Sequence, residues 1–218
     1  MIDDTIPSNN LKNKELTKQK LIKAVGELLQ ESGHTKLGIN KIARRANVDK
    51  KLIYRYFGGI ERLLQTYLRE QDYWISYAKH LEILSGPRQV EKTMELAIDI
   101  LQQQLDYLYK NSQMQKILLW EITENNPIFE DIAHEREMIG NTLLNFSDKR
   151  FEDPDTDFRT IFALLIAGIY YLVLHAKTCE TTFFDIDIKT QGGREQVYKA
   201  IRQIVTWAFA DENIKSSK

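Results

Sequence analysis

A break in the helical pattern between residues 40 and 58 most strongly constrains what this chain can fold into. The segment reads NKIARRANVDKKLIYRYFG, and its helical pattern stops at Asn47-Val48-Asp49 and then restarts. Asn47 tolerates the left-handed backbone of a tight turn. The carboxylate of Asp49 can accept hydrogen bonds from the free amides that open the next helix. The segment therefore predicts two short helices joined by a tight turn, which together form a helix-turn-helix.

The second of these helices combines an apolar anchor with cations and aromatic rings. Ile53 and Phe57 are four residues apart, so they share one face and can pack against the preceding helices. The cations on the remaining perimeter repel one another in water, and neighbouring phosphates would turn that repulsion into attraction. Tyrosine hydroxyls can also donate to phosphate oxygens. A solvated amphipathic helix is the alternative, but such helices rarely carry two rings as close as Tyr54 and Tyr56.

Charge is distributed unevenly along the chain, although the formal net charge is only -1. Residues 11–70 contain 14 Lys and Arg against 6 Asp and Glu, whereas residues 71–218 contain 16 against 23. A basic N-terminal part on an acidic body favours an anionic partner for the basic part. Uneven surface charge without such a partner is the alternative.

The segments around the helix-turn-helix complete a predicted domain of residues 16–62. Residues 1–15 are polar and lack a helical period, so we expect a flexible arm there. Thr17 is the expected cap of a first helix that ends before Gly33. A fourth helix is expected to run from about Ile60 past Trp74. The first helix carries an apolar stripe made of Leu21, Ile22, Val25, Leu28 and Leu29.

Residues 17–69 resemble the N-terminal domain of the tetracycline-repressor (TetR) family of bacterial transcription regulators. The resemblance covers about a quarter of the chain, and the spacing between its elements matches throughout. It is carried by Glu31-Ser32-Gly33, Ile42-Ala43, Ala46, Val48, Lys50, Ile53-Tyr54-Arg55-Tyr56-Phe57-Gly58, Glu61 and Leu63-Leu64.

The resemblance implies a sequence-specific transcriptional regulator, most often a ligand-responsive repressor, that binds a palindromic double-stranded DNA operator as a homodimer. The implied base-reading residues are Lys50, Lys51, Leu52 and Tyr54. Tyr54, Arg55 and Tyr56 are implied to contact phosphate or sugar, as are Asn40 and Lys41 near the start of the preceding helix. Gly38, Lys51, Leu52, Gly59 and Ile60 depart from the family's usual residues, which affects the expected operator sequence rather than DNA binding itself.

An all-α fold of about nine helices is predicted, with a larger helical bundle in residues 63–218. Prolines and glycines are few, and long periodic stretches separate them. Further helices are expected near 88–110, 112–124, 127–147, 156–178 and 194–210, with a cap at Asn126-Pro127 and a break at Gly192-Gly193. Residues 183–188 alternate as a strand does, and we expect a loop or an extended connector there.

The resemblance implies that this bundle dimerises, and the sequence is compatible with that. The helix near 156–178 is apolar nearly all round, so it must be buried on more than one side. Together with the last helix it could form a four-helix interface across a twofold axis. Packing of both helices within one subunit is the alternative. The expected interface residues are Ala163, Ala167, Gly168, Tyr171, Val197, Ile201, Ile204 and Ala208.

The resemblance also implies an effector pocket in the bundle. Polar or aromatic groups set in apolar helices would suit an apolar or aromatic small molecule held by a few polar contacts. Core packing is the alternative for the rings, and exposure to solvent is the alternative for the carboxylate. The candidates are Trp74, Tyr107, Trp120, Glu121, Tyr170, Tyr171 and His175.

Cysteine content and hydropathy favour a cytoplasmic protein with no membrane partner, and the resemblance implies that it is bacterial. Cys179 is the only cysteine, so no disulfide can form within the chain. The N-terminus lacks an apolar signal core, and the longest apolar run, 161–174, is shorter than the roughly 20 residues that span a membrane. The protein is expected to associate with the nucleoid when it binds DNA.

Two other functions were considered from the sequence. Asp131 and His134 lie three residues apart, as in di-iron helical bundles, and Glu121 and Glu124 are nearby. A second copy of that motif is absent from the sequence, as are HExxH and Cys/His metal motifs, Gly-rich phosphate loops and nucleophile elbows. We therefore expect no enzyme activity, metal or cofactor. A non-specific architectural DNA binder would bind with steep salt dependence but without sequence preference.

Overall fold

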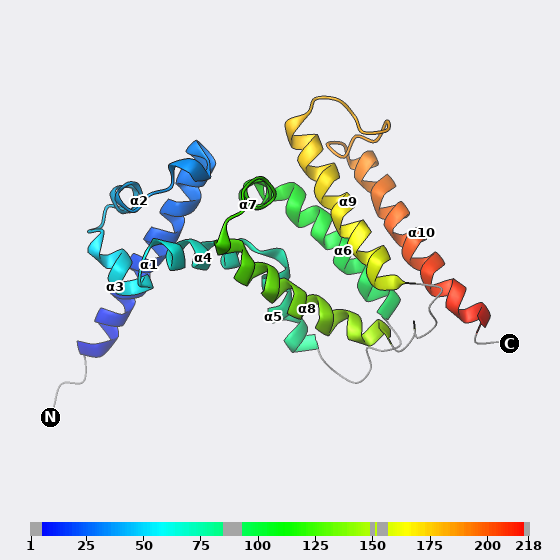
Figure 1. Ribbon diagram of the computed structural model, residues 1–218, viewed down its shortest axis with the longest axis horizontal. Helices are drawn as coiled ribbons and strands as arrows, with labels where there is room; N and C mark the ends of the chain where they lie inside the picture. Colours follow the sequence, from blue (N-terminus) through cyan, green and yellow to red (C-terminus); the bar gives the residue numbers. More distant parts are fainter. Residues whose placement is uncertain (1–5, 85–92, 149–150, 152–156, 216–218) are drawn as a thin grey trace. The chain divides into compact units, whose positions relative to one another are not determined.

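The computed structural model describes residues 6–84, 93–148, 151 and 157–215, which form ten α-helices (Figure 1). Within the described residues there is no β-strand, and an isolated bridge joins Phe183 to Ile186. The all-α prediction is confirmed, and residues 183–188 form the expected connector. The helices are α1 Ile6–Ser32, α2 Ile39–Ala46, α3 Lys51–Phe57, α4 Ile60–Gln71, α5 Tyr73–Leu84, α6 Thr93–Lys110, α7 Ser112–Thr123, α8 Glu130–Asp148, α9 Phe158–Thr178 and α10 Gln191–Lys215.

The chain divides into two compact units, and each unit is made of two separate stretches of the sequence. The first unit comprises residues 1–72 and 116–133, and the second comprises residues 73–115 and 134–218. The last part of α7 and the start of α8 therefore belong to the same unit as the helix-turn-helix. The domain boundary predicted near residue 62 stays a prediction.

The core of the first unit lies between α1, α2, α3 and α4. Helix α1 packs against α2 and α4, and α3 packs against α4. The apolar stripe predicted for α1 is buried, as are the inner residues of α2, one residue of α3 and three residues of α4. These buried side chains are Leu21, Ile22, Val25, Leu28, Leu29, Ile42, Ala43, Ala46, Ile53, Leu63, Tyr67 and Leu68.

The N-terminal helix is longer than the sequence pattern indicated. Helix α1 begins at Ile6, so residues 6–15, which were expected in a flexible arm, are helical. The hydroxyl of Thr17 donates to the Asn13 carbonyl at 2.8 Å, which places Thr17 inside the helix rather than at its cap. The extension contains two lysines, a leucine and a glutamate, which favour a helix without needing a packed face. This is why the apolar period did not reveal it.

A break at Asp72 separates α4 from α5, where one continuous helix was expected. Asp72 has an extended backbone, with φ -74° and ψ 127°, and is buried. The fourth helix therefore ends at Gln71, and Tyr73 begins a helix of its own. This division accounts for ten helices where about nine were predicted.

In the second unit, helices α5, α9 and α10 pack against α6. Leu101, Leu105, Val173 and Val205 are fully buried there. Three rings, of Phe151, Phe158 and Phe209, lie 4.9 to 5.1 Å apart between centroids. The ring contact between Phe158 and Phe209 joins α9 to α10, and both of these helices pack against α6.

The starts of the later helices show one confirmed cap and one wrong prediction. The Asn126 side chain accepts from the Ile128 amide at 3.1 Å, and Pro127 opens the short 3₁₀ turn Pro127–Phe129, as expected. Helix α10 instead begins at Gln191 and includes both glycines that were predicted to break the chain. A Cβ at Gly193 would lie 1.9 Å from the Asp187 carbonyl oxygen, so close packing explains this glycine.

Candidate nucleic-acid interface

The turn between α2 and α3 has the geometry that the sequence predicted. Asn47 adopts the left-handed region, with φ 52° and ψ 50°, and its amide donates to the Arg44 carbonyl at 3.1 Å. The Asp49 carboxylate accepts from the Lys51 amide at 2.8 Å, which confirms Asp49 as the cap of α3. The turn and its cap fix the direction in which α3 leaves α2.

Burial divides α3 into an anchoring side and an open side. Ile53 has an exposed fraction of 0%, and Phe57 is half-buried. Tyr54 is 59% exposed. The structure therefore places the predicted DNA-binding residues on the surface of the first unit. Asn40, Lys41, Lys50, Lys51, Tyr54 and Arg55 are exposed, and Leu52 and Tyr56 are half-buried.

The structure adds Lys14 and Lys18, two cations that the sequence pattern did not single out, to the surroundings of Tyr56. The Lys14 ammonium lies 5.7 Å from the centroid of the Tyr56 ring, and the Arg55 guanidinium lies 5.9 Å from the same centroid. Lys18 and Arg62 line, with Tyr56, a groove of about 420 Å³ between α1, α3 and α4. Lys14 was missed because residues 1–15 were taken for an arm rather than the first turns of α1.

An ion pair joins α1 to α2. Arg45 donates to both carboxylate oxygens of Glu31, at 2.7 and 2.5 Å, and to Glu27 at 3.4 Å. The hydrogen bonds from Arg45 hold the pKa of the Glu31 carboxyl below its ordinary value, and Glu31 in turn raises the pKa of Arg45. The bidentate geometry also fixes the orientation of α2 on α1.

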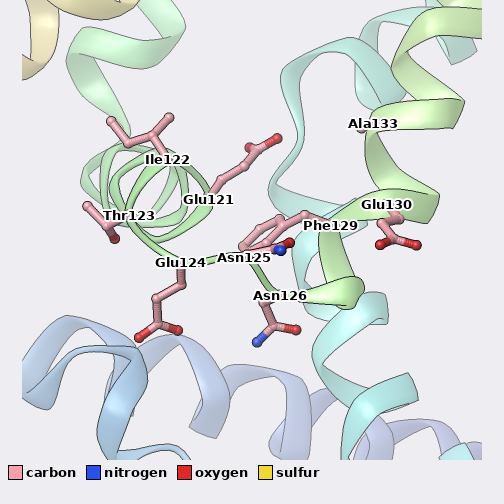
Figure 2. Close-up of a pocket in the computed structure, with 9 residues that line it drawn as sticks. All are labelled: Glu121, Ile122, Thr123, Glu124, Asn125, Asn126, Phe129, Glu130 and Ala133. Atoms are coloured by element: carbon pink, nitrogen blue, oxygen red, sulfur yellow. The ribbon is translucent and has the colours of Figure 1, made fainter.

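The residues predicted to form one ligand pocket lie in different places. Trp120 and Glu121 belong to the first unit, where Glu121 lines an open groove at the end of α7 (Figure 2). Tyr171 and His175 pack around the Phe183 ring, at 5.0 and 5.4 Å between centroids. Tyr107 packs near Tyr73 at 5.4 Å. These five residues therefore do not share the pocket that contains the remaining two.

That pocket lies in the second unit between α5, α8 and α9, and has a volume of about 430 Å³. Trp74 and Tyr170 line it, and the Trp74 indole donates to the Tyr170 hydroxyl at 3.2 Å. Buried Gln104 also donates to this hydroxyl, at 3.1 Å. Two arginines that the sequence reading had not singled out, Arg136 and Arg159, line the same pocket.

The predicted dimer residues fall into two groups. Ala163, Ala167, Gly168 and Tyr171 are exposed on α9, as an interface requires. By contrast, Val197, Ile201 and Ala208 are buried within the chain, and Ile204 is half-buried. The apolar stripe of α10 therefore packs in the core of its own unit, so the interface assignment of its three buried residues was wrong.

The residues behind the metal-enzyme alternative are not assembled into a metal site. Asp131 accepts from the Gln65 side chain at 3.0 Å, and His134 is exposed. In the described part of the chain, no group of three or more His, Cys, Asp or Glu side chains is placed to hold a metal ion. One described helix, α9, is long and apolar enough to cross a membrane by length and composition alone, a test that core helices of soluble proteins also pass.

The fold and the exposed cations define a helix-turn-helix protein, and comparison with known proteins shows what this helix-turn-helix is similar to. The model of the bacterial regulatory proteins of the tetR family matches residues 21–67. The "Probable HTH-type transcriptional regulator YttP" of Bacillus subtilis is 24% identical over 116 residues, which cover 53% of this chain and 55% of that protein. The match thus spans about half the length of this curated relative.

Solved structures show the same fold along most of the chain. A TetR-family transcriptional regulator from Haemophilus influenzae has a TM-score of 0.62 at 18% identity, covering 88% of this chain and 97% of its own. The regulator FadR from Bacillus subtilis, in complex with stearoyl-CoA, has a TM-score of 0.60 at 18% identity, covering 86% and 96%. Residues 21–67 thus match the tetR family model, and most of the chain shares the fold of these solved structures.

The Glu31–Arg45 pair makes stability depend on pH in a defined direction. Because Arg45 lowers the pKa of Glu31, the pair stabilises the folded state above the ordinary value of 4.5, and this contribution is lost as pH falls through the lower folded value. Urea unfolding should therefore show wild type more stable than Glu31→Gln at neutral pH, with the difference vanishing in acid. Exposed Glu180, changed to Gln, is the control. A difference that does not change with pH would contradict the ion pair.

Proposed function

We propose that this protein is a sequence-specific transcriptional regulator of the bacterial cytoplasm, a ligand-responsive repressor that binds a palindromic operator as a dimer. The observation that carries the proposal is the division of α3, in which Ile53 is fully buried while Lys50, Lys51, Tyr54 and Arg55 are exposed. Cations and hydroxyl donors held on a rigid helix are suited to phosphate and base contacts. The match of residues 21–67 to the tetR family model supports the same function.

In this proposal, α3 enters the major groove and α2 crosses the backbone beside it. Lys50 and Lys51, at the start of α3, are the groups that meet base edges, as the first residues of a recognition helix do. Leu52 can contact a thymine methyl group but cannot form a hydrogen bond with a base. Asn40 and Lys41, at the start of α2, contact phosphates and set the register of the protein on DNA.

Selection of bound fragments from a random DNA pool should yield a palindrome, and variants should then separate base from backbone contacts. Lys50→Ala should weaken operator binding by about 1–3 kcal/mol and relax the preference at one position of each half-site. Tyr54→Ala should weaken binding to the operator because a phosphate or methyl contact is lost. Lys199→Ala, which removes an exposed lysine of α10, is the control.

Both variants binding the operator as tightly as wild type would show that α3 is not the recognition helix. Salt titration tests the non-specific alternative. Affinity should fall by about 10³–10⁵ between roughly 50 and 200 mM salt for 6–10 phosphate contacts, whether or not binding is specific. A selected pool without any shared sequence would favour the architectural binder.

The dimer is proposed to form through the exposed apolar face of α9. Leu164 is 67% exposed there, and small residues beside it allow helices to approach closely. On α10, Trp207 is 65% exposed. Large apolar side chains left open on two neighbouring elements of a soluble protein indicate an interaction surface. A palindrome read by one helix-turn-helix per chain also requires two copies.

Light scattering should show a particle of twice the 25.5 kDa chain mass for wild type. Leu164→Arg and Trp207→Arg should shift it to the monomer, because a buried unpaired charge opposes association. Both should also weaken binding to the full palindrome. Ile122→Arg, at an equally exposed position of the first unit, is the control and should remain dimeric. Monomeric wild type, or dimeric Leu164→Arg and Trp207→Arg, would contradict this interface.

The effector is proposed to bind the pocket of the second unit, with an apolar part inside and an anionic group at its edge. Trp74, Phe162 and Ile166 provide apolar surface in this pocket. Arg159 donates to the side-chain oxygens of Asn141 and Asn145, at 2.9 and 3.3 Å, and Arg136 lies in the same lining. The guanidinium groups of these two arginines are the cationic part of the pocket lining.

Stearoyl-CoA, the ligand bound to the structurally similar FadR, is the probe for this pocket. It should quench or enhance Trp74 fluorescence and lower operator affinity by about 5- to 150-fold, the usual range of coupling. Arg159→Met should weaken stearoyl-CoA binding by about tenfold to a hundredfold, because bonds to a charged group are lost. Lys199→Met is the matched control. Unchanged stearoyl-CoA affinity in Arg159→Met would contradict an anionic site at this arginine.

A further inference from the structure

Three residues at helical spacing, Lys116 and Trp120 on α7 and Glu124 directly after it, contact the C-terminal end of α1 and the turn that follows it. All of them lie in the first unit. The Lys116 ammonium donates to the carbonyl oxygens of Leu29, at 3.5 Å, and Gln30. The last carbonyls of a helix lack partners within it and carry partial negative charge. Lys116 therefore caps α1 from another helix.

His34 is held by the other two residues of this stripe. Its ring stacks on Trp120 at 5.2 Å between centroids, with the two planes 5° apart. One oxygen of Glu124 pairs with the His34 Nε2 at 2.7 Å, and the other accepts from the Trp120 indole at 3.0 Å. The hydrogen bond with His34 lowers the pKa of the Glu124 carboxyl. Figure 2 shows Glu124 and Glu121 pointing to different sides of the end of α7.

The contact of His34 with Trp120 and Glu124 matters because His34 lies in the connection between α1 and α2. His34 begins the 3₁₀ turn His34–Lys36 between α1 and α2, and this turn buries none of its residues. The glycines on either side supply no capping side chain, and Gly33 has φ 72°. Because the connection has no core of its own, its attachment to Trp120 and Glu124 restrains where α2, and with it α3, begins.

The other end of α7 is held in the second unit by a similar device. Asn111 accepts from the amides of Gln113 and Met114, at 3.0 Å each, and so caps α7. Gln115 donates to the carbonyls of Leu108 and Tyr109, at 2.7 and 3.1 Å, in the last turn of α6. Gln115 thus holds the last turn of α6 within the second unit.

We propose that Lys116, Trp120 and Glu124 position the helix-turn-helix through the end of α1 and His34, so that operator binding and the state of this contact are energetically linked. The proposal rests on the proposed DNA-binding function. These are positioning residues, since they lie on α7 and directly after it rather than among the residues of α2 and α3 that are proposed to contact DNA. Thermodynamic linkage is reciprocal. An operator that binds one arrangement of the helix-turn-helix more tightly than another must therefore also shift the contact of Lys116, Trp120 and Glu124 with the end of α1 and His34.

A single-tryptophan protein tests this directly. Trp74→Phe and Trp207→Phe leave Trp120 as the only reporter, and its emission responds to the stacked imidazole and the Glu124 carboxylate. Adding the selected operator should change this emission, while an unrelated duplex of equal length should change it less. Operator binding is followed in parallel by anisotropy of labelled DNA.

Glu124→Gln should change operator affinity by about 2- to 30-fold, the range seen for residues along a coupling network. The salt slope should stay that of wild type, because no phosphate contact is lost. Glu130→Gln removes the same charge from an exposed glutamate of the same unit and should bind as wild type does. Lys116→Met replaces Glu124→Gln if thermal melting shows that the latter does not fold.

The outcomes separate this proposal from the function on which it rests. If the single-tryptophan protein binds the operator while its emission stays constant, or if Glu124→Gln and Lys116→Met bind as Glu130→Gln does, the positioning role is wrong and the DNA-binding function stands. If wild type binds no DNA sequence, the proposed function fails and the positioning role falls with it.

Discussion

The packing of Ile53 in the core is the interaction on which the proposed DNA-binding side of α3 depends. Helix α3 has seven residues, too few to be stable without tertiary contacts. Burying one isoleucine side chain contributes about 1.5–3 kcal/mol, and here it also fixes which side of α3 faces α4 and the core. Every exposed cation of α3 owes its orientation to this anchor. A DNA-binding helix of this length can present several charged groups only because one apolar residue holds it.

Polar contacts then fix the ends of the elements that the core holds together. Asp49 caps α3, Arg45 ties α2 to α1 through Glu31, and Lys116 caps α1 from α7. Each of these contacts satisfies charges or backbone groups at a helix end, where regular hydrogen bonding stops. The first unit therefore combines an apolar interior, which sets the packing, with terminal contacts, which set the direction of each helix.

Local patterns made the helix-turn-helix predictable from the sequence. The left-handed turn at Asn47, the cap at Asp49 and the Ile53 anchor all depend on residues within one turn of each other. The break at Asp72 was not predictable in this way, because an extended, buried aspartate is not marked by a glycine or a proline. The contact of Lys116 with α1 joins residues 86 positions apart, beyond any helical period.

The candidate sites differed in how far the sequence could identify them. Of the residues of α3 that are predicted to bind DNA, Lys51, Tyr54 and Arg55 are exposed, whereas Leu52 and Tyr56 are half-buried. Helical periodicity could predict this because it decides which side of a short helix is buried. The ligand candidates were selected by residue type alone, and the structure brings only Trp74 and Tyr170 into one pocket. Val197, Ile201 and Ala208 share an apolar stripe, but periodicity cannot distinguish a stripe that faces the core from one that faces a second subunit.

Methylation interference on the bound operator tests the major-groove position of α3 most directly. Guanine N7 lies in the major groove and adenine N3 in the minor groove, so methylation at each position reports which groove is occupied. If α3 lies in the major groove of a dimer-bound palindrome, guanine N7 methylation should block binding in two symmetric patches about one helical turn, or a multiple of it, apart. Interference from adenine N3 alone, or a single patch without symmetry, would contradict this position of α3.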